Sequence, residues 1–204
     1  MSGLPPTRVI LWDIMDTLVR DPFFTHMPAF FGHSFQELVA RLTPRAWVEF
    51  ELGQLTEPEF YARFFRDGSA IDGAGLKQHM AEAYRWIEGI ESLLGELRQA
   101  GLPMHALSNY PLWYQLVEQR LGLSRYVELS FISCHTGLRK PAPEAFLHAC
   151  TQLALPPEAC LLVDDRAQNC AAARAIGMAA IQFEGSVPSL RQALQAHGLW
   201  VTPQ

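Results

Sequence analysis

The sequence predicts an α/β fold: a three-layer, Rossmann-like, doubly wound parallel sheet with an inserted helical unit. Two observations lead to this prediction. Short apolar runs alternate with helix-length amphipathic segments along most of the chain, which is typical of parallel strands linked by helical crossovers. The gap between the first two apolar runs is too long for a single crossover helix, and it therefore indicates an insertion after the first strand.

The expected strands are the apolar runs at residues 8–12, 103–107, 129–134, 160–163 and 179–183. The expected helices lie between or after them, near residues 91–100, 112–121, 143–153, 169–176 and 189–196. Because strands and helices alternate in this way, we assign residues 1–19 and 87–204 to one Rossmann-like core.

Residues 20–86 are expected to form a helical insert with helix starts of its own. Thr43 followed by Pro44 predicts an N-cap with proline at the first helical position. The run from Thr56 to Glu59 matches a capping box. The segment is rich in Phe, Trp and Tyr, and we expect most of these rings to form the core of the insert, with a few facing a substrate.

The composition narrows the possible functions. A chain of 204 residues with 49% hydrophobic and 18% charged residues is typical of a globular protein with one full core and a modest insert. The net charge of −5 and the absence of a Lys/Arg cluster argue against a nucleic-acid partner. No run approaches the roughly 18 apolar residues of a membrane span, and the cysteines form no CxxC pair. With no secretory signal before the first strand, we expect a cytoplasmic protein without a membrane or zinc-binding role.

Polar residues follow the expected strands where a ligand site would lie. In doubly wound sheets, ligands bind outside the carboxyl ends of the strands. The residues at these ends are Asp13 after the first strand, Ser108 and Asn109 after the second, Lys140 in the loop after the third, and Asp164 and Asp165 after the fourth. We therefore expect their side chains to meet at one edge of the sheet.

These residues belong to four short motifs in a set order: Asp13 to Thr17, Leu107-Ser108-Asn109, Arg139-Lys140-Pro141, and Asp164-Asp165 followed by Asn169. The ordered set resembles the motifs of the haloacid dehalogenase superfamily, and the insert resembles the small helical cap of one branch of that superfamily. The resemblance covers essentially the whole chain. It implies a Mg²⁺-using hydrolase that acts on a small phosphorylated metabolite.

The resemblance also implies a role for each motif residue. Asp13 would be the nucleophile that accepts the phosphoryl group, a reaction that needs positive charge around the transferring oxygens. Ser108 and Lys140 would be catalytic groups that bind the phosphate. Backbone N–H groups around Met15, Asp16 and Asn109 would complete the anion cradle.

A metal site is implied in the same way. Mg²⁺ prefers hard oxygen ligands. The implied ligands are Asp13, the backbone carbonyl of Met15 and Asp165, with Asp164 close by or acting through water. Thr17 is expected to fix the loop after the first strand, and Asn169 to play a supporting, orienting role.

Each motif residue also has a purely structural interpretation. The Ser108-Asn109 pair could cap the helix expected near residue 111, the acidic pair could cap the helix near residue 167, and Lys140 could be a surface charge. Their common position at one sheet edge favours a shared site. We further expect Arg166 to form an ion pair with Asp16 or Glu184 rather than to contact a substrate.

One position departs from the phosphatase pattern. The residue two beyond the nucleophile is normally a second Asp that acts as general acid and base, but here it is Met15. A thioether cannot carry the proton, and loss of a general acid or base costs about 10²–10⁴ in rate. His26 in the insert is a candidate substitute donor, whereas Asp16 follows one residue late and the turn would aim it elsewhere.

Three hypotheses are compatible with Met15. The first is a Mg²⁺-dependent phosphatase whose leaving group needs little protonation, or one that borrows a proton donor from the insert. The second is a 2-haloacid dehalogenase-type carbon–halogen hydrolase, since halide departure needs no acid. The third is a protein that binds its ligand with negligible turnover. The acidic pair beside Asp13 would repel it unless a cation lay among them, and this favours the phosphatase.

Overall fold

A computed structural model of the chain describes residues 8–199 and contains one five-stranded sheet. The strands are β1 (Val9–Trp12), β2 (Met104–Ser108), β3 (Glu128–Ile132), β4 (Cys160–Asp164) and β5 (Ala179–Gln182). They lie in the order β3-β2-β1-β4-β5, and each pair of neighbours is parallel. Because the chain winds outward from β1 in both directions, the expected doubly wound sheet is confirmed.

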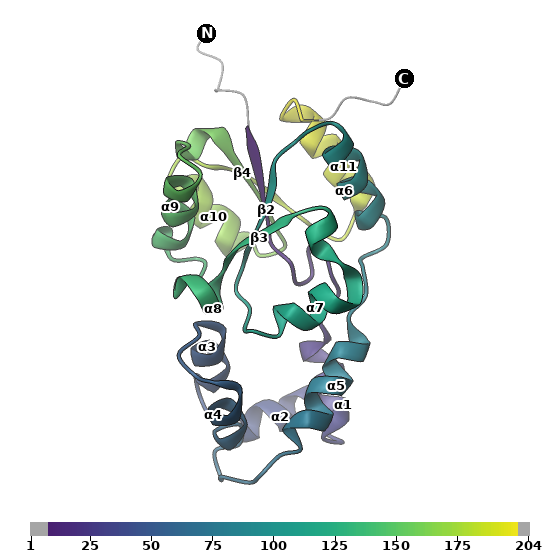
Figure 1. Ribbon diagram of the computed structural model, residues 1–204, viewed down its shortest axis with the longest axis vertical. Coiled ribbons are helices and arrows are strands. Elements are labelled where there is room, and N and C mark those ends of the chain that lie inside the picture. The colour runs from purple at the N-terminus through teal and green to yellow at the C-terminus, as the bar shows by residue number, and fades with distance from the viewer. Residues whose placement is uncertain (1–7, 200–204) are drawn as a thin grey trace.

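Helices cover both faces of this sheet (Figure 1). The core helices are α6 (Ile90–Gln99), α7 (Tyr114–Leu121), α8 (Ser133–Thr136), α9 (Pro143–Gln152), α10 (Ala167–Ala175) and α11 (Val187–Ala196), with 3-10 turns η2 (Leu123–Arg125) and η3 (Pro157–Ala159). Alternate residues of β1 point to opposite faces: Ile10 packs in one apolar cluster with residues of α6, α7 and α11, and Leu11 packs in a second with residues of α9 and α10. The sheet is thus the middle of three layers.

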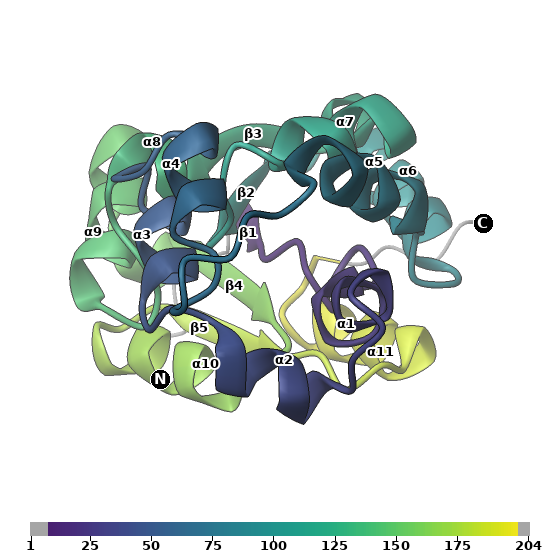
Figure 2. The same cartoon turned by 90° about the horizontal axis from the view of Figure 1, so that it is seen from below.

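The segment between β1 and β2 forms the helical insert. It contains η1 (Pro22–Phe24), α1 (His26–Phe30), α2 (Phe35–Arg41), α3 (Ala46–Glu51), α4 (Glu57–Ala62) and α5 (Gly73–Ala83). These elements lie below the sheet in Figure 1, and Figure 2 shows them spread around the ends of β1, β2 and β4. The two connections run side by side, since Ile87 N–H donates to Leu18 O at 3.0 Å and Arg20 N–H to Arg85 O at 2.9 Å. The insert therefore leaves and re-enters the core at one place.

Local signals in the insert had different outcomes. The capping box is confirmed, because the side chain of Thr56 accepts from Glu59 N–H and the Glu59 carboxylate accepts from Thr56 N–H at 2.8 Å. The helix start at Thr43 and Pro44 is wrong. Arg45 adopts a left-handed conformation with φ of 68°, and α3 begins only after it, at Ala46, with no side-chain cap.

The third strand also ends earlier than expected. The chain turns into α8 at Ser133, whose hydroxyl accepts from Tyr110 N–H at 3.0 Å and donates to the Glu51 carbonyl at 2.5 Å. These bonds hold residue 133 against the insert instead of continuing the ladder. As expected, most aromatic rings of the insert pack against one another. Phe50 and Phe60 are stacked with ring centroids 4.4 Å apart. Both rings also contact Trp113, which precedes α7 in the core.

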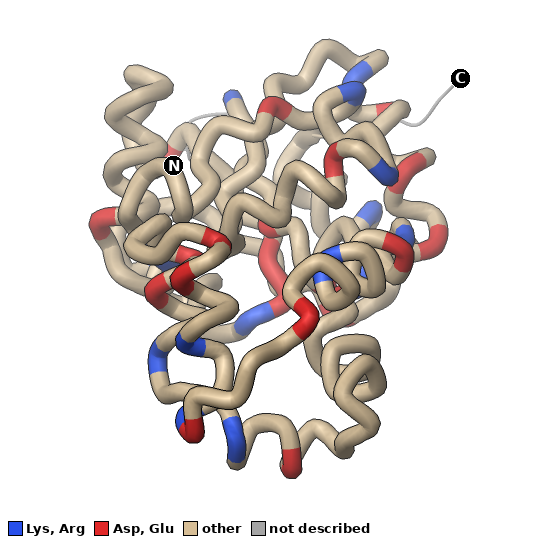
Figure 3. The backbone as a smooth tube through the Cα atoms, turned by 60° about the horizontal axis from the view of Figure 1, so that its bottom comes forward, with Lys and Arg blue, Asp and Glu red and all other residues tan. Residues whose placement is uncertain are grey.

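Charge and helix length bear on possible partners. Lys and Arg positions are scattered among Asp and Glu positions in Figure 3 rather than gathered into one basic run. Within residues 8–199, none of the helices combines the length and the apolar character needed to cross a lipid bilayer.

Candidate active site

The structure brings the expected residues together at the carboxyl edge of the sheet, around a buried ammonium group. Lys140 Nζ lies 2.8 Å from Asp13 Oδ1 and 2.6 Å from Asp164 Oδ2. The side chain of Lys140 is 1% exposed, so it is not the surface charge that its residue type usually implies. Residues 13, 140 and 164 are far apart in the sequence, and their contact follows from the parallel order of β1 and β4.

Asn109 holds Lys140 in place. Its side-chain Nδ2 donates to the Lys140 carbonyl, its Oδ1 accepts from Lys140 N–H, and both bonds are 2.8 Å long. This reciprocal pairing fixes the backbone from which the lysine side chain extends toward Asp13. We had expected Asn109 to contribute through its backbone N–H, and sequence reasoning did not predict the side-chain clamp.

Asp164 is fully saturated by protein groups. Besides Lys140, it accepts bonds from Asn169 Nδ2 at 2.9 and 3.0 Å and from Arg166 N–H at 2.9 Å, and it is 0% exposed. Asn169 thus orients the first residue of the acidic pair, where we expected an orienting side chain. Neither member of the pair caps α10 through its side chain, since Arg166 occupies the N-cap position.

Thr17 connects the nucleophile candidate to the second acidic residue. Its hydroxyl donates to Asp13 Oδ2 at 3.3 Å and accepts from Asp165 N–H at 3.1 Å. Asp165 is half-buried and lines the cavity described below. Within residues 8–199, no hydrogen bond or ion pair engages the carboxylate of Asp165, and no backbone bond is made to the carbonyl of Met15.

These oxygens fit a magnesium ion. Asp13, Asp165 and the Met15 carbonyl are hard donors, and Mg²⁺ is usually held by one or two carboxylates together with phosphate and water. The described residues contain no cluster of three or more His, Cys, Asp or Glu side chains suited to a metal. A site built from two carboxylates and a carbonyl would therefore need substrate and water oxygens to complete an octahedron.

Burial sets the electrostatics of the cluster. It raises the pKa of Asp13 to about 7, with Asp164 and Asp165 adding to the effect and Lys140 opposing it. Burial and the charge of Asp164 also raise the pKa of Asp165. Burial acts to lower the pKa of Lys140, but the carboxylates of Asp13 and Asp164 outweigh it and raise this pKa. Carboxylate charge exceeds what one lysine can balance, so a bound cation would favour the ionised forms.

Two expected phosphate contacts look different in the structure. The hydroxyl of Ser108 is buried without a partner among the described residues, so it has an unused bond for a phosphate oxygen, although Ser108 is not among the cavity-lining residues. It does not cap α7, whose N-cap position is Trp113. The backbone N–H of Asp16 is unsuited to the anion cradle, because it donates to Val19 O at 2.7 Å.

A cavity of about 140 Å³ opens beside this cluster. Its walls come from the sheet edge and from the insert: Asp13, Met15, Asp16, Asn109, Tyr110, Arg139, Lys140, Asp165, Arg166 and Asn169 on one side, and Asp21, Phe23, Phe24, Trp47 and Glu51 on the other. Glu51 and Arg139 join the two sides by an ion pair of 2.7 Å. Trp47 Nε1 donates to the second oxygen of Glu51 at 2.7 Å.

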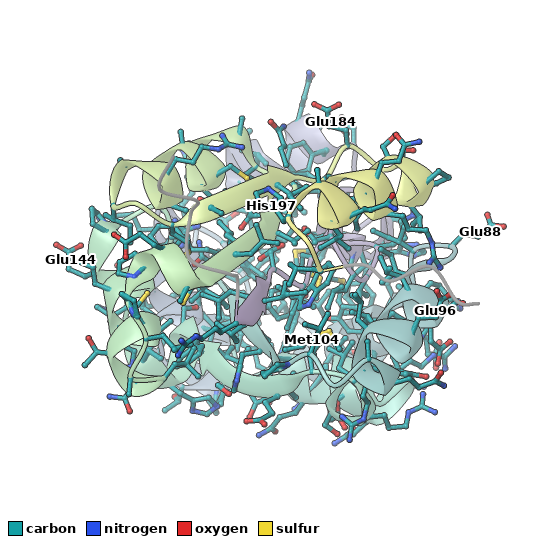
Figure 4. The ribbon with its side chains drawn as sticks, turned by 90° about the horizontal axis from the view of Figure 1, so that it is seen from above. Glu88, Glu96, Met104, Glu144, Glu184 and His197 are labelled. Atoms are coloured by element: carbon teal, nitrogen blue, oxygen red, sulfur yellow. The ribbon has the colours of Figure 1, made fainter. Side chains whose placement is uncertain are left out.

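Several cavity residues were missed or misplaced by the sequence. Asp21 and Glu51 carried no motif signal, and Arg139 was named only as the residue before Lys140 in its motif, without a role of its own. Only the fold places these three residues at the cavity. The expected ion pair of Arg166 is wrong: no salt bridge of residues 8–199 includes it, and Glu184 projects outward at the rim in Figure 4. His26 does not line the cavity, since its ring instead lies 5.9 Å from that of His79.

Comparisons with known proteins point to one family of hydrolases. A sequence model of the haloacid dehalogenase-like hydrolases matches residues 7–177. The chain is 41% identical over 178 residues to the chloroplastic flavin mononucleotide hydrolase 1 of Arabidopsis thaliana, covering 87% of this chain and 73% of the relative. It is 35% identical over 158 residues to a phosphoglycolate phosphatase of Cupriavidus necator, covering 77% and 63%.

Solved structures show the same fold. A magnesium complex of a haloacid dehalogenase family enzyme from Bacteroides thetaiotaomicron matches with a TM-score of 0.75 and 19% identity, covering 89% of this chain and 96% of that one. At this level of identity the likeness concerns the fold alone. The five-stranded parallel sheet with flanking helices is therefore shared with enzymes of that kind.

Proposed function

Because this chain belongs to the haloacid dehalogenase-like hydrolases, we propose that it is a Mg²⁺-dependent phosphatase that acts on a small phosphorylated metabolite. One observation supports this most: the ammonium of Lys140 lies 2.8 Å from Asp13 Oδ1 in a cavity that Asp165 also lines. A carboxylate nucleophile, a cation beside it and a second carboxylate for a metal are the groups that phosphoryl transfer requires.

The protein groups would divide the work as follows. Asp13 attacks phosphorus and becomes an aspartyl phosphate, which water then hydrolyses. Lys140 reduces the charge on the nucleophile and the phosphoryl oxygens, and Asn109 keeps it aligned. Ser108 donates its unpaired hydroxyl to a phosphate oxygen. Asp13, Asp165 and the Met15 carbonyl would hold Mg²⁺, which would supply positive charge to the phosphoryl oxygens and help to orient the substrate.

The aromatic part of the cavity wall supports a substrate with a planar, apolar body. Phe23, Phe24 and Trp47 line the cavity, and Phe24 is 44% exposed, so part of its ring surface is open to a ligand. The relative from Arabidopsis is named as a flavin mononucleotide hydrolase. We therefore propose a phosphomonoester with an aromatic ring system, such as FMN, as the first substrate to test.

The insert would act as a cap. We propose residues 1–19 and 87–204 as the catalytic core and residues 20–86 as a cap that closes over the substrate and excludes water. The paired connections near residues 19 and 86 support this division, because both ends of the insert meet at one place. A cytoplasmic location stays a prediction, since the Arabidopsis relative is chloroplastic.

The proposal is tested by measuring phosphate release from FMN, phosphoglycolate and p-nitrophenyl phosphate with Mg²⁺ and with EDTA, using wild-type protein and Asp13→Asn. We expect Mg²⁺-dependent turnover of at least one ester, reduced by about 10³-fold or more in the variant. Equal rates for wild type and variant would overturn the phosphatase. Halide release from 2-haloacids in EDTA would instead support the dehalogenase, and tight FMN binding without turnover would support the binding protein.

A further inference from the structure

The proposed phosphatase lacks the usual proton donor for its leaving group. Met15 lines the cavity at the position where related phosphatases carry a second Asp, and its thioether has no proton to give. An alkyl phosphate releases an alcohol only if the departing oxygen gains a proton, so another group in the cavity must supply it. The inference below rests on the proposed function.

The loop after β1 folds back on itself, and it brings the carboxylate of Asp21 to the cavity that Met15 lines. Asp16 N–H donates to Val19 O at 2.7 Å, and Asp21 N–H donates to Asp16 Oδ1 at 3.1 Å. Asp21 therefore lies one hydrogen bond from the residue that follows Met15. Asp13, Met15, Asp16 and Asp21 all line the same cavity.

The side chain of Asp21 suits proton transfer. Its Oδ1 accepts from Phe23 N–H at 2.9 Å, whereas no residue in the described range donates a hydrogen bond to its Oδ2. Burial raises the pKa of Asp21 to about 6, with a smaller contribution from the charge of Asp16 and opposing effects of the Phe23 N–H and Arg166. The other charged group that faces it is Glu51. The carboxyl is therefore protonated in an appreciable fraction of molecules near neutral pH.

The other acidic groups of the insert side and the nearby phenol are already engaged. Both oxygens of Glu51 accept bonds, one from Trp47 and one from Arg139. The hydroxyl of Tyr110 pairs with that of Tyr84 at 2.8 Å, and burial raises the pKa of Tyr110 well above its ordinary value. Neither group is positioned to give a proton to an alkoxide.

We propose that Asp21 replaces the missing second Asp as general acid and base. In the first step, an oxygen of Asp13 bonds to phosphorus, the phosphorus–alcohol oxygen bond breaks, and the departing oxygen takes the proton of Asp21. In the second, the Asp21 carboxylate takes a proton from water as the water oxygen bonds to phosphorus. The bond between phosphorus and Asp13 then breaks, which restores both carboxyl groups and releases phosphate.

The test compares two leaving groups in wild-type protein and in Asp21→Asn. Asparagine can still accept from Phe23 N–H, so the turn is kept while the proton is lost. We measure leaving-group release in single turnover, because the later hydrolysis of the aspartyl phosphate uses Asp21 as base for both esters alike. We expect the rate of riboflavin release from FMN, an alkyl ester, to fall by about 10²-fold or more, and the rate of p-nitrophenolate release, which needs no proton, to change by less than about 3-fold. In wild type, FMN turnover relative to aryl turnover should fall as pH rises through about 6, because the protonated acid is lost. In Asp21→Asn, the ratio of FMN turnover to aryl turnover should not depend on pH in this range.

Asp67→Asn is the matched control. Asp67 makes the same bond to the backbone two residues on, from Ser69 N–H at 2.9 Å, but its side chain is 55% exposed and does not line the cavity. We expect no change in either rate. A second variant, Met15→Asp in the Asp21→Asn background, should restore FMN turnover by about 10-fold or more, because it returns the acid to its usual position.

The outcomes separate the two proposals. Equal losses in the single-turnover rate of leaving-group release for both esters in Asp21→Asn would assign Asp21 a structural role and overturn this inference alone. A leaving-group-dependent loss in Asp16→Asn instead of Asp21→Asn would also overturn it. Wild-type protein inactive on both esters would overturn the proposed function and this inference with it.

Discussion

The sheet edge and the helical insert face each other across one cavity, but different types of side chain form their two walls. At the sheet edge, polar side chains hold one another in fixed positions, as Lys140 does between Asp13 and Asp164. On the insert side, Phe23, Phe24 and Trp47 form most of the wall. Under the proposed function, the difference means that the edge would set the type of reaction, which needs groups at fixed distances, while the insert would set the substrate, which needs only a surface of suitable shape and polarity.

The largest expected effect comes from removing the buried cation. Lys140→Met should lower turnover by about 10³-fold and the free energy of unfolding by about 3–5 kcal/mol, because it leaves two buried carboxylates unpaired. Kinetics and urea denaturation measure both quantities. Lys77→Met is the control in the insert: Lys77 pairs with Glu57 at 3.0 Å but is 39% exposed, so we expect a loss below about 1 kcal/mol. Equal losses would contradict the contrast between the two regions.

A smaller effect is expected at the seam between them. A Cβ at Gly53 would lie 2.3 Å from the carbonyl oxygen of Cys134, in a backbone with φ of +69°. Gly53→Ala should cost about 1–3 kcal/mol through this collision, beyond the backbone strain of about 1 kcal/mol. Gly32→Ala has a similar φ of +66° with nothing within 4 Å and isolates the strain. Denaturation curves that coincide for the two variants would show that the insert does not rest on α8.

The smallest effect concerns the aromatic wall. Phe24→Ala should raise the KM for FMN by about 2- to 10-fold, which corresponds to the loss of one aromatic contact, and leave that for p-nitrophenyl phosphate and the stability nearly unchanged. Leu147→Ala in α9 is the control. The side chain of Leu147 is also 44% exposed, but Leu147 is not among the residues that line the cavity. If the two variants bind FMN alike, Phe24 has no part in recognising the substrate.

The two regions also differ in how far the sequence predicts them. The order of strands and the meeting of Asp13, Lys140 and Asp164 follow from apolar runs and motif positions, because strand ends of a parallel sheet share one edge. The insert was predicted as a helical unit with two helix starts, of which the capping box at Thr56 is confirmed and the start at Thr43 is wrong. Helix α3 of the insert starts at Ala46, after Arg45 in a left-handed conformation, and no capping pattern in the sequence predicts that conformation.

Within the site, the missing information was long-range. The clamp of Asn109 on the Lys140 backbone joins residues 31 positions apart, and the pair of Glu51 with Arg139 joins residues 88 apart. Asp21 reaches the cavity because the loop after β1 closes through Asp16. No periodicity or motif in the sequence predicts which of these residues contact one another, so only the folded arrangement reveals the contacts.

The most direct test of the central claim is to trap the covalent intermediate. Wild-type protein turning over FMN with Mg²⁺ is quenched in acid, reduced with borohydride to convert an acyl phosphate into an alcohol, and digested for peptide mass spectrometry. We predict homoserine at position 13, dependent on both FMN and Mg²⁺. Sustained turnover with an unmodified Asp13, or reduction at another carboxylate, would contradict Asp13 as the nucleophile.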